Sequence, residues 1–318
     1  MKKYLEDLKN ELIQKNINDT DIKDIIKDHE EMIEEALADG LSEDDLVLRF
    51  GSPKQIADEL AEDLEKNEEK INQKSNTQEN DFDFTVREEQ YKIQVNLSSE
   101  DITIKPSSDD MIHVRIDGNN KKDIIYVTFE NGLLSIHKDK LKLRKFTIFE
   151  SDKDVTIELP STKKISSFMI KNVSGDLNIN DLNAQHLNIN IVSGDIEVKQ
   201  LISESVQLHI VSGDVSLSNI YTDKLHTSQV SGDFEISKSK IENEFESQTV
   251  SGDLEIDDVS CELFDLDSVS GDTDAKEFYP NTIRFKSVSG DLDISNKTKK
   301  EIKIISQKTL SGDVNIDL

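Results

Sequence analysis

The sequence has little of what usually stabilises a compact domain. Among 318 residues there is no Trp, a single Cys and only 5% aromatic residues. With one cysteine, Cys261, no intrachain disulfide can form. Val, Ile and Leu must therefore supply the buried surface, which suits many thin layers better than one thick core. We expect Cys261 to be a small buried hydrophobe, because the acidic residues around it disfavour a thiolate.

Basic residues are also scarce. The chain has 38 Lys and Arg against 66 Asp and Glu, which gives a formal net charge of −28 and a pI of about 4.5. Proteins that bind nucleic acids broadly depend on Lys and Arg to neutralise phosphates. We therefore expect no nucleic-acid partner, and no general attraction to anionic membrane surfaces beyond that of a local basic patch.

Long apolar runs are absent as well. The chain starts MKKYLEDLKNELIQK, and its two lysines are not followed by the apolar segment of about 7–15 residues found in a signal peptide. Nowhere do about 18 apolar residues follow one another, as a membrane-spanning helix requires. We predict a cytoplasmic location, with peripheral contact at the membrane left open.

The first 65 residues have the periodicity of amphipathic helices. Leu5, Leu8 and Leu12 fall on one stripe, and a second stripe spans residues 22–37. Residues 52–55, Ser-Pro-Lys-Gln, are typical of a helix start, with a capping Ser and a Pro at the first helical position. We predict an acidic bundle of four helices. Residues 66–81 hold too few apolar side chains to form a core and are predicted to be a polar linker.

Residues 38–60, ADGLSEDDLVLRFGSPKQIADEL, resemble the bacterial HTH-associated α-helical signalling domain. Members of that family commonly carry Gly-Ser-Pro-Lys-x-Ile-Ala, which is found here from Gly51 to Ala57. The resemblance covers about residues 1–65 and implies a signalling role for them. The predicted outer faces are rich in carboxylates, which form either a solvated acidic surface or a docking surface for a basic partner: Glu30, Glu31, Glu34 and Glu35.

Residues 82–160 show short period-2 patterns bounded by Gly, Asn, Asp and Pro, which predict an irregular β region that leads into the repeats. A basic patch at residues 137–146 stands out against the acidic background. It either protects an exposed strand edge from aggregation or contacts anionic lipid or the acidic helical domain. Its interaction candidates are Lys138, Lys140, Lys142, Arg144 and Lys145.

A strict internal repeat follows. Val-Ser-Gly-Asp occurs seven times from Val173 onward, and Leu-Ser-Gly-Asp occurs at Leu310, at spacings of 19, 19, 19, 20, 19, 19 and 22 residues. A period near 20 residues is typical of a solenoid. We predict that residues 161–318 form a β-solenoid of the β-helix kind, with rungs ~4.8 Å apart. The Val before each Ser and the apolar residue after each Asp are expected to point inward. The predicted fold class is a multi-domain α plus all-β protein.

Each motif is predicted to form a corner. Gly permits the positive φ of a tight turn, and Ser and Asp can bind nearby backbone N–H groups. Stacked carboxylates one rung apart repel each other by ~1 kcal/mol in water. They must therefore be solvated, tied to backbone donors or neutralised by cations, and both a structural corner and a cation site are open interpretations of Asp176, Asp195, Asp214, Asp233, Asp253, Asp272, Asp291 and Asp313. We expect no other metal site, no cofactor and no catalytic residues.

The repeat resembles the bacterial "putative adhesin" β-strand-repeat family over about residues 90–318, including the Leu159-Pro160 step. The combination with a helical signalling domain is found in Gram-positive proteins associated with cell-envelope stress. We predict a non-enzymatic protein-interaction scaffold in cell-envelope stress signalling, whose partners include membrane-associated stress-response proteins. Because solenoid ends need a cap, the C-terminal end of the solenoid is expected to be covered either by self-association or by the helical domain. The alternatives are a surface adhesin-like binding protein and a β-helix carbohydrate-active enzyme, although no cluster of catalytic side chains breaks the repeat.

Overall fold

The structure is a computed structural model that describes residues 2–15, 22–23, 26, 53–54, 57, 80–118, 124–138, 153–299 and 301–317. The chain divides into two compact units. One contains Met1–Gln78 and Lys140–Phe149, and the other contains Glu79–Asp139 and Glu150–Leu318.

The first unit begins with helix α1 (Lys2–Gln14). Its predicted stripe is buried, with Leu8 and Leu12 at 0% exposure and Leu5 at 8%. Residues 22–23, 26, 53–54 and 57 are also helical, and Ile22 and Ala57 are buried. The remainder of the three further predicted helices and most of the predicted linker lie outside the described residues. No helix in the described part of the chain is long and apolar enough to cross a membrane.

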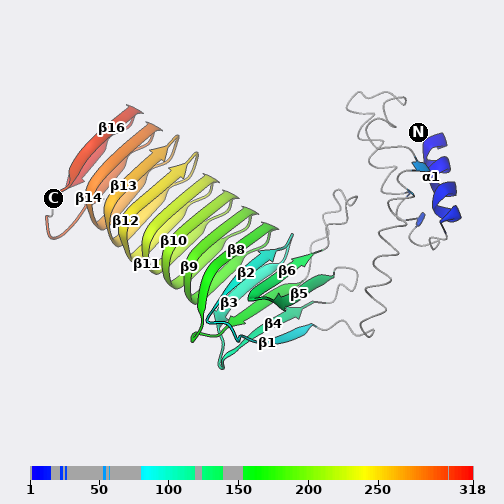
Figure 1. The fold of residues 1–318 in the computed structure, drawn as a ribbon. Coiled ribbons are helices and arrows are strands. Elements are labelled where there is room, and N and C mark those ends of the chain that lie inside the picture. The colour runs from blue at the N-terminus through cyan, green and yellow to red at the C-terminus, as the bar shows by residue number, and fades with distance from the viewer. Residues whose placement is uncertain are drawn as a thin grey trace. The chain divides into compact units, whose positions relative to one another are not determined.

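The second unit is a stack of β-strands (Figure 1). The early strands are short, and from β9 onward most strands run through a whole coil. Their bounds are β1 (Asp81–Thr85), β2 (Gln90–Asn96), β3 (Asp101–Pro106), β4 (Met111–Asp117), β5 (Ile125–Glu130), β6 (Leu133–Lys138), β7 (Asp154–Leu159), β8 (Lys164–Ser174), β9 (Leu177–Ser193), β10 (Ile196–Ser212), β11 (Val215–Ser231), β12 (Phe234–Thr249), β13 (Leu254–Ser268), β14 (Thr273–Ser289), β15 (Leu292–Ser295), β16 (Lys303–Ser311) and β17 (Val314–Asp317).

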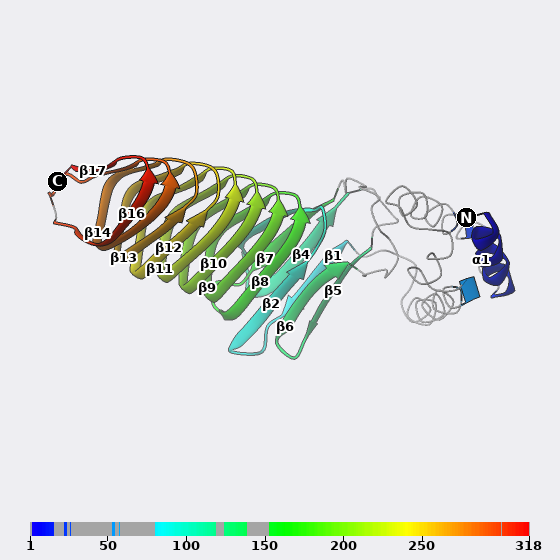
Figure 2. The ribbon, with the colours of Figure 1, turned by 90° about the horizontal axis from the view of Figure 1, so that it is seen from above.

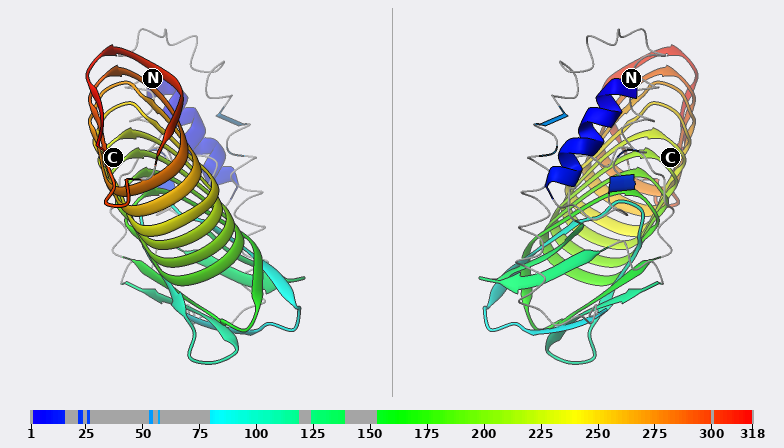
Figure 3. Two further views of the ribbon diagram at one scale, coloured as in Figure 1. Left: turned by 90° about the vertical axis from the view of Figure 1, so that its left-hand side faces the viewer. Right: turned by 90° about the vertical axis from the view of Figure 1, so that its right-hand side faces the viewer.

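The repeats form a parallel β-solenoid, as the spacing predicts. Strand β10 pairs in parallel with β9 and β11 at an offset of one repeat, so that Ile179, Val198 and Leu217 occupy the same place in three successive coils. These positions are almost fully buried, and one continuous hydrophobic cluster runs from Val86 to Ile302. Seen along the stack, successive coils trace loops of similar outline (Figure 3). Each coil thus buries its inward residues against the coils before and after it.

The first coils are assembled out of chain order (Figure 2). Strand β2 pairs in parallel with β6 on one side and with β8 on the other. In the same way β3 lies between β7 and β9. Three pairings are antiparallel: β4 pairs with β7, β1 pairs with β4, and β5 pairs with β6. The stack of coils therefore begins within residues 82–160, where the sequence predicts only an irregular β region.

Departures from the 19-residue period are absorbed at defined places. The pairing of β11 with β12 shifts register between Thr222 and Lys224, and that of β12 with β13 shifts between Lys240 and Glu244. The extra residue of the 20-residue repeat therefore lies between Ile241 and Glu244. The inward-facing positions on either side of it keep their register with the neighbouring coils.

Aromatic side chains are concentrated in one part of the core. The ring centroid of Phe264 lies 5.1 Å from that of Phe245 and 5.1 Å from that of Phe278. All three rings are fully buried, on three adjacent coils. Cys261 is buried nearby at 6% exposure, as a small hydrophobe would be.

Candidate functional site

The Gly of each motif forms a column along one corner of the solenoid. Gly252 has φ +119°, and a Cβ atom on it would lie 1.9 Å from the carbonyl oxygen of Gly232 on the preceding coil. The same overlap recurs from Gly175 to Gly312, at 2.4 Å or less. Only glycine lets neighbouring corners approach this closely, because any side chain would strike the backbone of the preceding coil.

The Asp of each motif is tied to the next coil by a backbone hydrogen bond. Asp195 N–H donates to Asp176 Oδ1 at 2.9 Å, and Asp214 N–H donates to Asp195 Oδ1 at 2.9 Å. The bond repeats along the whole stack at 2.8–2.9 Å, and its acceptors are Asp101, Asp176, Asp195, Asp214, Asp233, Asp253, Asp272 and Asp291, with Asp313 as the last donor. We call these nine residues the aspartate ladder.

The ladder bonds give the aspartates a structural role, in agreement with one of the two interpretations that the sequence left open. Charge-assisted hydrogen bonds of this kind are stronger than neutral ones and offset the repulsion between stacked carboxylates. In the residues that the structure describes, no group of three or more His, Cys, Asp or Glu side chains is arranged to hold a metal ion.

Asp101 belongs to the ladder although it lies outside the eight repeats predicted from the sequence. It lies in Ser98-Ser99-Glu100-Asp101, where Glu100 replaces the Gly of the motif, and an apolar-x-apolar run follows. Glu100 is fully buried and accepts the backbone N–H groups of Ser98 and Ser99 at 3.0 and 3.1 Å. The Asp followed by that alternating run could have identified this coil from the sequence.

Lys138, one of the predicted interaction candidates, forms an ion pair with Glu100, and its side chain is only 14% exposed. It is therefore held inside the first coils and does not offer a free basic surface. The other candidates lie outside the described residues: Glu30, Glu31, Glu34, Glu35, Lys140, Lys142, Arg144 and Lys145.

The Val of each motif points outward, and the prediction that it points inward was wrong. Val211 and Val230 are 47% and 46% exposed, whereas the residues before them, Ile210 and Gln229, are buried at 3% and 5%. Because side chains alternate along a strand, the buried residue immediately before the motif places the Val on the outer face. The valine ladder, as we call this exposed column, consists of Val173, Val192, Val211, Val230, Val250, Val269 and Val288, with Leu310 in the last coil.

The outward column beside the valine ladder is not uniform. In register across six coils it reads Asn190, His209, Ser228, Gln248, Asp267 and Lys286. The strand conformation therefore accepts amide, imidazole, hydroxyl, acidic and basic groups at an outward position two residues away. The constant Val is not a general requirement of outward positions in these coils.

A second exposed feature lies beside another turn of the coils, where Asn219, Lys238 and Asp258 have positive φ. A hollow of about 340 Å³ is lined by Tyr221, Lys240, Ser260 and Tyr279, among others. The Tyr221 hydroxyl donates to Glu242 at 2.6 Å, and the Lys240 ammonium lies 5.4 Å from the Tyr221 ring centroid. The hydrogen bond with Glu242 raises the pKa of Lys240. These contacts fix the orientation of the Tyr221 ring beside the hollow.

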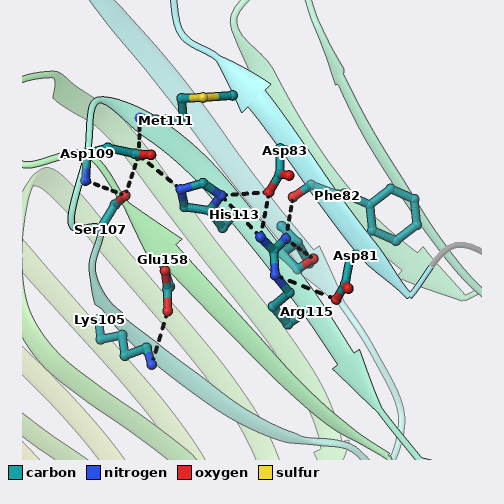
Figure 4. A network of polar contacts seen from close by, with 11 residues as sticks. Asp81, Phe82, Asp83, Lys105, Ser107, Asp109, Met111, His113, Arg115 and Glu158 are labelled. Atoms are coloured by element: carbon teal, nitrogen blue, oxygen red, sulfur yellow. Dashed lines mark hydrogen bonds and ion pairs between the residues drawn. The ribbon is translucent and has the colours of Figure 1, made fainter.

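A polar network joins β1 to β4 at the start of the stack (Figure 4). His113 lies between two carboxylates, with Nδ1 at 2.6 Å from Asp83 Oδ1 and Nε2 at 2.9 Å from Asp109 Oδ1. Arg115 donates to Asp83 at 2.7 Å. The hydrogen bond that His113 donates to Asp83 raises the pKa of His113, and the bonds that Asp83 accepts from His113 and Arg115 lower the pKa of Asp83. A charged imidazole between two carboxylates thus fastens the first strand to the sheet.

The pKa of Asp109 is also lowered, chiefly because its carboxylate accepts the backbone N–H of Met111 and then because it binds His113. His113 and Arg115 thus bind groups of the fold itself, namely Asp83, Asp109 and the carbonyl of Phe82. We therefore assign the network a structural role and identify the valine ladder, with the aspartate ladder beside it, as the candidate binding face.

The sequence matches the family described as Toastrack DUF4097 over residues 91–243 and 204–318, and the chain belongs to this family. Residues 3–59 match the family described as HAAS. The sequence has no significant match among curated proteins.

The chain is similar to several solved structures. A "putative lipid binding protein" from Parabacteroides distasonis is 16% identical, with 76% of this chain and 98% of that chain covered and a TM-score of 0.52. A "putative adhesin" from the same organism is 15% identical, with 74% and 96% covered and a TM-score of 0.47. A "putative adhesin" from Bacteroides fragilis is 20% identical, with 74% and 95% covered and a TM-score of 0.37. The first of these supports the β-solenoid assignment.

Proposed function

We propose that the chain is a non-enzymatic protein-interaction scaffold in which the solenoid presents the valine ladder as its binding edge. The observation that carries this proposal is one exposed apolar side chain per coil, repeated without a break from Val173 to Leu310, in a chain of net charge −28. A contiguous apolar surface bordered by polar residues is typical of a protein-interaction site.

The biological setting that we propose is signalling in the bacterial cell-envelope stress response. The HAAS match over residues 3–59 supports it, because the resemblance of this segment to helical signalling domains implies a docking or regulatory role. In this proposal the helical unit and the solenoid bind different proteins, and the partners include membrane-associated stress-response proteins.

Crosslinking and capture from native cells tests the proposal. We would compare the full-length chain with a triple variant, Val211→Thr, Val230→Thr and Val250→Thr, and with a chain that lacks residues 1–70. We expect stress-response membrane proteins to be captured by the full-length chain and the captured set to shrink in each altered protein. Ile202→Thr is the matched control, because Ile202 is 56% exposed in a different column. Identical captured sets from all four proteins would contradict the proposal.

An adhesin-like surface protein is the second candidate. The hollow beside Tyr221 and Tyr279 favours it, because an exposed aromatic ring with polar neighbours, such as that of Tyr221, is suited to bind carbohydrate or lipid head groups. The names of the structural neighbours agree with such a role for those proteins. Protease added to intact cells distinguishes the two: degradation of the chain outside the cell would support the adhesin, and full protection would support the scaffold.

A further inference from the structure

The valine ladder has a defined spacing. Its members lie one strand apart, which corresponds to ~4.8 Å between neighbours and ~34 Å from the first to the last of eight rungs. The strands are in parallel register through most of the stack. Immediately after the valines, Ser193 pairs with Ser212, and Ser212 pairs with Ser231. A partner that uses this ladder must therefore offer apolar side chains at a similar interval along a straight line.

An amphipathic α-helix offers that interval. Its apolar stripe recurs every ~3.5 residues on average, which is ~5.2 Å at a rise of ~1.5 Å per residue. Over five rungs the mismatch with the ladder stays below ~2 Å, which flexible side chains can absorb. Same-face side chains of an extended strand recur every ~6.6 Å and would lose register within two rungs. The spacing thus favours a helix over an extended peptide.

The negative charge of the aspartate ladder determines which kind of helix can bind along the valine ladder. The aspartate ladder follows the valine ladder at a distance of three residues in every motif, and all of its members are exposed. One carboxylate oxygen of each Asp from Asp101 to Asp291 accepts the next backbone N–H, which holds the row of charges in a fixed line. A helix with Lys or Arg on one side of its apolar stripe would place those cations along this row. A second copy of the chain would instead bring two acidic rows together.

We propose that a basic amphipathic helix of a partner protein lies along the valine ladder, with its apolar stripe on the valines and its cationic side toward the aspartate ladder. This inference rests on the proposed function, since it names the kind of partner that the scaffold binds. A helix of about 22 residues spans the full ladder.

The test measures binding of a labelled 22-residue helical peptide to the full-length protein by fluorescence anisotropy. The peptide carries Leu at the a and d positions of each heptad and Lys beside them. One control peptide replaces Lys by Glu, and another has the same composition in a scrambled order that removes the stripe. We expect saturable binding of the first peptide, no binding of the Glu peptide, and binding of the scrambled peptide that is at least ten-fold weaker.

Protein variants locate the site. The triple variant Val211→Thr, Val230→Thr and Val250→Thr keeps β-branched side chains and should weaken binding by about ten-fold. Asp214→Asn with Asp233→Asn keeps the Oδ1 acceptors and should reduce the salt dependence of the affinity. Ile202→Thr should leave binding unchanged. Circular dichroism melts confirm that each variant is folded before its affinity is compared.

Equal binding of the ordered and scrambled peptides would overturn the proposal, because it would show charge attraction alone. Unchanged affinity of the folded valine variant would also overturn it. If no peptide binds but the valine variant still loses partners in cellular capture, the helix inference fails while the scaffold function stands. If capture is unchanged as well, both fail. Concentration-dependent dimerisation that the valine variant abolishes would identify a second copy as the occupant and would overturn the helix.

Discussion

At the scale of single residues, the glycine column sets the tightest limit on the fold. We predict that Gly252→Ala lowers the free energy of unfolding by about 3–5 kcal/mol, because φ +119° is strained for alanine and its Cβ would overlap Gly232 O at 1.9 Å. Chemical denaturation followed by circular dichroism measures the loss.

Gly132→Ala is the matched control for this substitution. Gly132 has φ +70°, but its nearest neighbour would be Glu88 Cγ at 3.4 Å, which is ordinary contact with a movable side chain. Its expected cost is about 1–2 kcal/mol, from the left-handed backbone alone. Similar losses for both variants would show that contact between successive corners does not determine the requirement for glycine.

The valine ladder also shows where prediction from sequence failed at this scale. The motif is apolar at its first position, and an apolar residue in a repeat is most simply assigned to the core. In the structure Ile191 and Ile210 occupy the inward positions, and the valines that follow them face outward. In other repeats the inward residue before the Val is polar, as with Gln229 and Ser268. The alternation of apolar and polar residues is then not visible in the sequence, and only the strand register in the structure shows which side chains face inward.

At the scale of elements, the His113 network makes the attachment of β1 dependent on pH. The folded-state pKa of His113 is raised above its ordinary value of 6.5, so its contribution to stability is complete below pH 6.5 and is lost as the pH rises through the raised value. The lowered pKa values of Asp83 and Asp109 act in the opposite sense, and their contribution is lost as the pH falls below 3.8.

We therefore predict that His113→Gln destabilises the β1–β4 pairing more at pH 5.5 than at pH 8.5. Hydrogen exchange of the β1 amides at the two pH values, corrected for intrinsic rates, measures the difference. His186→Gln, at an exposed position in β9, is the control and should leave β1 unchanged at both values. Equal destabilisation at the two pH values would show that the charge of His113 does not hold the strand.

The 20-residue repeat gives a second prediction for elements. Deletion of Asn243 removes the extra residue between Ile241 and Glu244 and restores the 19-residue period, so we expect Tm to fall by less than about 4 °C. Deletion of Glu235 instead moves the inward Ile236 toward the outer face and should lower Tm far more. Thermal melts of both deletions at one protein concentration provide the measurement. Equal losses would place the extra residue elsewhere.

Much of the element structure follows from the sequence, because each coil repeats the same alternation and the same corner. The order of the first coils does not. Strands β2 and β3 have ordinary period-2 patterns, and nothing in Ile93 or Ile102 indicates that β6 and β7 will lie on their outer side. That arrangement depends on long-range pairing, which local periodicity does not encode. Asp101 was missed for a different reason, because Glu100 stands where the repeat motif has glycine, although the alternating run after Asp101 is visible in the sequence.

At the scale of the whole solenoid, stability should vary along the stack, since each coil is supported by its neighbours. Strand β11 pairs with a long strand on each side, whereas the side chains of β16 are largely exposed and Leu310 is 84% exposed. We predict that amides in Lys303–Ser311 exchange with deuterium before those in Val215–Ser231. Mass spectrometry of peptides from these segments tests the order, and uniform protection would indicate a single cooperative unit.

The placement of β2 and β3 inside the stack has a consequence for synthesis on the ribosome. These strands emerge before β6 and β7, yet they are covered on one side by β6 and β7 and on the other by β8 and β9. Until residue 179 has left the exit tunnel, the nascent chain lacks one of the two surfaces against which its first coil packs. From that point each further segment of about 19 residues can pair with a coil that has already formed. Folding can then keep pace with translation, one coil at a time.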